Sequence, residues 1–85
     1  MDLTVETKQY KFSASSGFDY IVIYICNKLK ESPDFGSKHY LTKKEVCDLI
    51  EYLQENNCGD SWIVDRLSNM ILLMEGKEKA EFRFW

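Results

Sequence analysis

The twelve residues from Phe18 to Leu29 form the most apolar stretch of the chain, and nine of them are apolar or aromatic. So much contiguous apolar surface is unfavourable in water, so other parts of the protein or a partner must cover this segment. It is too short to span a bilayer, because a membrane-spanning helix needs about 20 apolar residues. The stretch is therefore expected to build the core of a folded domain.

Two secondary structures compete for this stretch. Its four β-branched residues favour a strand. The flanks favour a helix, because Ser16 followed three residues later by Asp19 resembles a capping box, and Pro33 prevents the helix from continuing. We interpret residues 18–29 as a helix, and a strand over residues 20–25 stays open as the alternative.

As a helix, this segment is apolar on almost its whole surface for two turns. One arc carries Phe18, Ile21, Val22, Ile25, Cys26 and Leu29, and the opposite side carries Tyr20, Ile23 and Tyr24. The surplus predicts cover on two sides, by helices on one and by strands or a partner on the other.

The composition describes one small folded domain over residues 1–85, with 45% hydrophobic residues. The net charge of −3 argues against a general nucleic-acid binder. We also expect no binding to a membrane. The polar amino-terminal segment does not resemble a signal peptide, and the odd number of cysteines (Cys26, Cys47 and Cys58) favours free thiols. We therefore expect a cytoplasmic protein.

The pattern of apolar, polar and turn-forming residues divides the rest of the chain into secondary-structure elements. Residues 3–12 alternate as a strand, with a change of face at Lys8 and Gln9 that indicates a bulge. The segment 34–40 is expected to be a connector that places Phe35 and Tyr40 on the core.

Two further helices are predicted after this connector. Thr42 and Glu45 form a capping box that predicts a helix over residues 43–56. Asp60 or Ser61 caps a third helix running to Glu75, with Gly76 after its end. The buried faces are expected to carry Val46, Leu49, Ile50 and Leu53 on the first of these helices, and Ile63, Val64, Leu67, Met70, Ile71 and Met74 on the second.

The closing residues 79–85 alternate between charged and apolar side chains, which is typical of a half-buried strand. The expected fold is a small α+β domain in the order strand, helix, helix, helix, strand. The two terminal strands pair antiparallel against a helical layer, since a two-stranded ribbon alone is marginal in water.

The second helix carries an acidic surface, because no Lys or Arg occurs between Glu45 and Asp65. The simplest interpretation is a solvated face, and the alternative is a surface that docks a basic groove on another protein. Its candidate residues are Glu45, Asp48, Glu51, Tyr52, Glu55, Asp60 and Trp62. A second hypothesis is self-association as a homodimer through spare apolar residues, namely Tyr20, Ile23, Tyr24, Trp62, Leu72 and Leu73.

The sequence gives little support for a catalytic site or a metal site. His39 is the only histidine, and the cysteines lack the close spacing of zinc ligands, so no metal or other cofactor is expected. Cys47 and His39 lack a third residue to orient them as a nucleophile pair, so we expect no enzyme. A winged-helix DNA-binding protein is a third hypothesis, disfavoured because the last helix offers only Arg66 and Asn69 for base contacts.

Several short motifs occur in the order found in a known family. They are Tyr10-Lys11-Phe12, Gly17-Phe18-Asp19, Tyr40-Leu41, Val46-Cys47 and Glu81-Phe82. In these residues the chain resembles the type II-C anti-CRISPR proteins, small phage-type inhibitors. The resemblance implies a non-enzymatic inhibitor that binds the HNH nuclease domain of a guide-RNA-directed nuclease. The chain departs from the family at Glu78 and Lys79, where the family has a small polar pair, so no contact residue is carried over.

Overall fold

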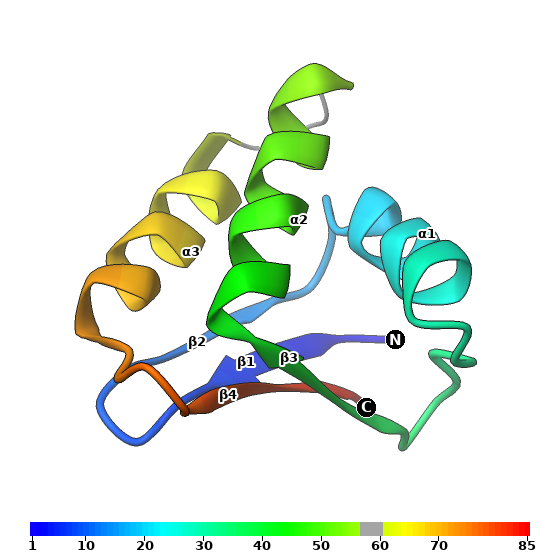
Figure 1. The fold of residues 1–85 in the computed structure, drawn as a ribbon. Coiled ribbons are helices and arrows are strands. Elements are labelled where there is room, and N and C mark those ends of the chain that lie inside the picture. Colours follow the sequence, from blue (N-terminus) through cyan, green and yellow to red (C-terminus); the bar gives the residue numbers. More distant parts are fainter. Residues whose placement is uncertain (57–60) are drawn as a thin grey trace.

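The protein has two layers, a four-stranded sheet and three helices that all lie on one face of it (Figure 1). The computed structural model describes residues 1–56 and 61–85. Its elements are β1 (Leu3–Glu6), β2 (Lys11–Ala14), α1 (Asp19–Lys28), β3 (Lys38–Thr42), α2 (Lys43–Glu55), α3 (Ser61–Leu73) and β4 (Lys79–Phe84). The small α+β fold expected from the sequence is confirmed.

The two ends of the chain form the middle of the sheet, whose strand order is β2-β1-β4-β3 with antiparallel neighbours throughout. Leu3 lies opposite Phe84 and Val5 opposite Phe82, and all four side chains are buried beneath the helices. The predicted antiparallel pairing of the terminal strands is therefore confirmed. Two strands that the sequence analysis did not predict complete the sheet.

The first of these is β2, because the expected bulged strand over residues 3–12 is in fact a hairpin. The backbone N–H of Thr7 donates to the carbonyl of Tyr10 at 2.8 Å, which closes the turn between β1 and β2. The change of face at Lys8 and Gln9 marks this turn and not a bulge. Ser13 and Ala14, which follow the expected strand, lie in this second strand.

The second is β3, which replaces part of the expected connector over residues 34–40. His39 and Leu41 point into the core, so the alternation of a strand turns Tyr40 outward. Phe35 is 78% exposed and Tyr40 51% exposed, and the prediction that both pack on the core is wrong.

The apolar stretch is a helix, as predicted, although its start and one of its faces differ. Phe18 occupies the N-cap position without a side-chain hydrogen bond, so the capping box assigned to Ser16 and Asp19 does not form. Tyr24, on the side opposite Ile21 and Ile25, is buried, whereas Cys26, on the same arc as those two residues, is exposed. The cause is the position of α1 beside α2, which turns the Tyr24 side of the helix inward (Figure 1).

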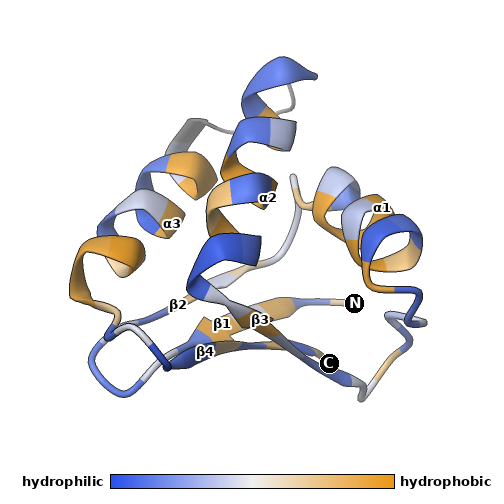
Figure 2. Cartoon of the chain, in the orientation of Figure 1, coloured by the Kyte–Doolittle hydropathy of each residue, from blue (hydrophilic) through white to orange (hydrophobic). Residues whose placement is uncertain are grey.

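The other two helices follow the sequence pattern closely. Both hydrogen bonds of the capping box between Thr42 and Glu45 are present at the start of α2. Figure 2 shows hydrophilic residues along the length of α2, alternating with hydrophobic ones. On both helices the predicted residues are buried or packed against the core. The helix α3 ends at Leu73, two residues before the predicted Glu75.

The buried side chains form one cluster between the sheet and the helices. The largest fully buried members are Phe82, Phe84, Leu3, Ile21, Ile25, Leu41, Leu49, Ile63, Leu67 and Met70. Within the described ranges, no helix combines the length and the apolarity that crossing a membrane requires.

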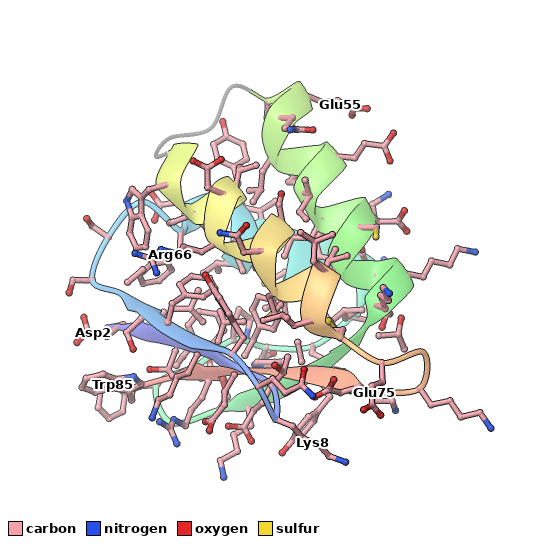
Figure 3. The ribbon with its side chains drawn as sticks, turned by 90° about the vertical axis from the view of Figure 1, so that its left-hand side faces the viewer. Asp2, Lys8, Glu55, Arg66, Glu75 and Trp85 are labelled. Carbon is pink, nitrogen blue, oxygen red and sulfur yellow. The ribbon has the colours of Figure 1, made fainter. Side chains whose placement is uncertain are left out.

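One carboxylate joins two loops at the end of the sheet. Glu78 accepts hydrogen bonds from the backbone N–H of Lys8 at 2.8 Å and of Glu75 at 3.2 Å. Lys8 and Glu75 lie at the same end of the molecule (Figure 3). These two donors lower the pKa of the Glu78 carboxyl below its ordinary value of 4.5, because they stabilise the charged form.

We predict that Glu78→Gln lowers the melting temperature at neutral pH. The folded-state pKa of Glu78 is depressed, so its contribution to stability is present above pH 4.5 and is lost as the pH falls through the folded-state pKa. The wild-type and Glu78→Gln melting temperatures should therefore converge below that pH. Thermal unfolding across the acidic range tests this, and the control is Glu81→Gln, which removes a carboxylate that accepts a hydrogen bond from the Tyr40 hydroxyl. A difference that is constant with pH would contradict this account.

Candidate protein-binding site

The helices α1 and α2 enclose a groove of about 240 Å³ on the outer surface of the helical layer. It is lined by Tyr24, Lys28, Asp48, Glu51, Tyr52 and Glu55. Most of the predicted acidic surface therefore lies along this groove, together with Tyr24, which the sequence assigned to self-association.

Helical spacing explains why these residues meet. Asp48, Tyr52 and Glu55 are separated by four and three residues, so they share one side of α2. Tyr24 and Lys28 are four residues apart and share the facing side of α1. The helices lie side by side (Figure 1), so the two rows face each other. The groove is a consequence of two helical periodicities.

Three tyrosines form the aromatic part of the site. The ring of Tyr52 lies 6.1 Å from that of Tyr20 and 5.9 Å from that of Tyr24, in tilted arrangements typical of stabilising aromatic pairs. The Tyr24 hydroxyl donates to the backbone carbonyl of Glu45 at 3.2 Å. Because both its ring and its hydroxyl are held, Tyr24 ties α1 to α2 and fixes the floor of the groove.

The carboxylates along the groove have no cationic partner within residues 1–56 and 61–85, where the ion pair found joins His39 to Glu31. Lys28 lines the groove but forms no ion pair with Asp48, Glu51 or Glu55 among these residues. Like charges three and four residues apart on a helix repel each other by a few tenths of a kcal/mol per pair. The groove therefore carries negative charge that the described part of the chain leaves uncompensated.

Glu45 plays a different part from the other three acids. Its carboxylate accepts a hydrogen bond from the backbone N–H of Thr42 at 2.9 Å, within the capping box. It therefore serves the start of α2 and is already engaged, although its charge adds to the field of the groove.

This field acts on the tyrosine beneath it. Burial raises the pKa of the Tyr24 hydroxyl above its ordinary value of 10.0, and the carboxylates of Asp48 and Glu45 raise it further. Negative charge opposes the formation of a phenolate. Tyr24 thus reports the electrostatic character of the groove.

Trp62 does not join this site, contrary to the prediction. It lies on α3, across α2 from α1 (Figure 1), and its ring packs edge-on against Phe12 of β2 at 6.2 Å. Trp62 is therefore occupied in fixing α3 to the sheet. Asp60, another predicted member of the acidic surface, lies outside the described residues.

Apart from Trp62, the predicted self-association residues lie in three places. Tyr24 lines the groove and Tyr20 packs on Tyr52 beside it, whereas Ile23 lines a separate hollow of about 570 Å³ beside Met1 and Phe18. Leu72 and Leu73 are exposed at the end of α3. The structure does not bring these five residues together into one surface.

His39 is held in place by contacts within the fold. It is buried, with Nδ1 2.6 Å from a Glu31 carboxylate oxygen and Nε2 2.8 Å from the Ser37 hydroxyl oxygen, and its ring meets Phe84 edge-on. It thereby holds the segment before β3 against the core. The described part of the chain contains no group of three or more metal-ligating side chains.

The cysteines are apart from these features. Cys26 and Cys47 are free and exposed, as expected for free thiols. Cys58 lies outside the described residues. Comparison of the chain with protein-family models, with curated proteins and with solved structures finds no match.

We predict that Asp48→Asn lowers the pKa of Tyr24 toward 10.0, because it removes a negative charge that opposes the phenolate. Glu51→Gln is the matched control, since it removes the same charge from the same helix but is not among the groups that raise this pKa. NMR titration of the Tyr24 ring signals in the alkaline range measures both. An equal effect of the two variants would mean that the groove has no specific local field.

Proposed function

We propose that this protein is a non-enzymatic inhibitor that binds a basic protein through the groove between α1 and α2. The observation that carries the proposal is the set of uncompensated carboxylates beside a fixed aromatic floor. A cationic side chain from a partner supplies the missing charge. Binding of this kind relieves the repulsion along α2 in addition to forming new contacts.

Arginine fits the groove better than lysine does. Its planar guanidinium stacks on a tyrosine ring and donates several hydrogen bonds at once to carboxylates. Tyr52 offers such a ring next to Asp48 and Glu55. A cation over an aromatic face contributes about 0.5–2 kcal/mol, and charge-assisted hydrogen bonds add to this. The groove is therefore proposed as the anchor point for one basic side chain.

A nuclease or another nucleic-acid enzyme is the proposed partner. Such enzymes hold the phosphate backbone with Lys and Arg, so an acidic surface competes for the same residues. The resemblance to type II-C anti-CRISPR proteins favours an HNH nuclease domain. Inhibition then follows from occupation of the basic surface, with no chemical step on the inhibitor.

Self-association is the competing proposal, supported by the exposure of Ile23, Leu72 and Leu73. Sedimentation at micromolar concentration distinguishes the two. A strict monomer supports capture of another protein, whereas a dimer that survives charge reversal in the groove supports self-association.

We predict that the double variant Asp48→Lys/Glu55→Lys weakens partner capture about tenfold or more, because it reverses two charges in the groove. Both residues line the groove and are exposed, so the fold should persist. The assay is calorimetric titration of a type II-C guide-RNA-directed nuclease or its isolated HNH domain, at low and high salt. Circular dichroism confirms folding.

The control for this test is Asp65→Lys/Glu75→Lys, which makes the same change in net charge away from the groove. Both control residues are exposed, and neither lines the groove. Capture should survive in this control. An equal loss in both variants would reduce the role of the acidic residues to a general charge effect, and retained capture by the groove variant would remove the groove from the account.

A further inference from the structure

The face of the sheet opposite the helices is uncovered (Figure 1). Along β4, Ala80, Phe82 and Phe84 point into the core, so Lys79, Glu81 and Arg83 point to the other side. This open face is separate from the groove between α1 and α2. It has its own pattern of charged and aromatic side chains.

A pair of cations on this face is flanked by two aromatic residues. Lys38 of β3 lies directly opposite Arg83 of β4. Tyr40 follows Lys38 by two residues and Trp85 follows Arg83 by two residues, so all four belong to the same side of the sheet. The cation pair is therefore flanked by an aromatic residue at each end.

Hydrogen bonds hold both aromatic residues in place. The Trp85 indole N–H donates to the Thr4 hydroxyl at 2.7 Å, and the Thr4 and Ser13 hydroxyl oxygens are 3.0 Å apart. Thr4 is only 2% exposed although it lies on the open face, which places the indole over the sheet. The Tyr40 hydroxyl donates to Glu81 at 3.2 Å. Trp85 is still 48% exposed and Tyr40 51% exposed, so both retain free ring surface.

The cation pair is unfavourable for the isolated protein. Like charges directly opposite each other in an antiparallel sheet are destabilising, and neither Lys38 nor Arg83 has a carboxylate partner within the described residues. The carboxylates on this face belong to the next row, in which Glu81 lies between Glu6 and Tyr40. An anion bound between Tyr40 and Trp85 would relieve the repulsion between Lys38 and Arg83.

We propose that the open sheet face binds single-stranded nucleic acid, with backbone phosphates over Lys38 and Arg83 and bases stacked on Tyr40 and Trp85. The two aromatic positions are four residues apart along the strands, about 13 Å at about 3.3 Å per residue. This separation accommodates a few nucleotides. Exposed aromatic side chains on a sheet combined with nearby cations are the usual means of binding single strands.

This inference revises the sequence-based expectation of no nucleic-acid contact, which rested on the net charge of −3. Net charge averages over the whole surface. In the fold, the uncompensated acids of α2 lie in the helical layer, whereas Lys38 and Arg83 lie on the far side of the sheet. The inference uses none of the groove residues, so it stands or falls independently of the proposed inhibitor function.

The test is fluorescence anisotropy of a labelled oligothymidylate of about ten nucleotides, titrated with the full chain at several salt concentrations. Two phosphate contacts to a single strand predict a slope of about −1.4 for the logarithm of the affinity against the logarithm of the salt concentration. Tyr40→Ala, on an exposed side chain of an edge strand, should weaken binding at least about fivefold by removing one stacked base. Lys38→Ala should reduce the slope by about 0.7.

The groove variant Asp48→Lys/Glu55→Lys adds positive charge outside the sheet face. In this variant, oligothymidylate binding should still be weakened by Tyr40→Ala. The groove variant therefore tests the inhibitor function without changing the sheet face, so failure of one proposal can be told from failure of the other. Absence of any anisotropy change at low salt would overturn the inference. So would binding that is indifferent to Tyr40→Ala, or equal binding of polyglutamate, because either result would reduce the face to a simple ion-exchange surface.

Discussion

The antiparallel pairing of β1 with β4 is the contact on which the rest of the structure depends. It joins the two ends of the chain in the centre of the sheet, with Leu3 beside Phe84 and Val5 beside Phe82 under the helices. The strands β2 and β3 then add to the outer sides of this pair. Every helix packs on the surface that results, so loss of this pairing would remove both the floor of the core and the frame that holds the helices together.

A sheet covered on one face only has two functional consequences. The helices must pack side by side, and the outer edge of the contact between α1 and α2 becomes the groove with its tyrosines and carboxylates. The uncovered face keeps its polar side chains, and Trp85 lies with Asp2 at its end, far from Glu55 at the top of α2 (Figure 3). The same layering thus separates an acidic surface from one that carries a cation pair.

The sequence predicted the elements whose signals are local. The capping box at Thr42, the periodicities of α2 and α3, and the alternation of β4 all have their cause within a few residues. The sequence-based prediction failed mainly where contacts with residues distant in the chain determine the structure. β3 is an edge strand of five residues, and Tyr24 is buried only because α2 lies beside it. The hairpin turn is a local feature that was misassigned, because its change of face resembled a bulge.

The candidate site shows the same division. The acidic row on α2 follows from helical spacing, but its union with Tyr20 and Tyr24 depends on how α1 and α2 pack. Trp62 looked like a free anchor because its contact, Phe12, is fifty residues away in the chain. No local pattern in the sequence indicates that the two tyrosines belong with the acids, or that Lys38 would lie opposite Arg83.

The most direct test of the central claim is a two-dimensional NMR titration of the aromatic side chains with a short arginine-rich peptide. If the groove accepts a guanidinium, the ring signals of Tyr20, Tyr24 and Tyr52 shift together and saturate, while the Trp62 indole signal stays in place because Trp62 packs on Phe12 outside the groove. Saturating shifts at Trp62 with unchanged tyrosine signals would contradict the account, and so would no shift at all.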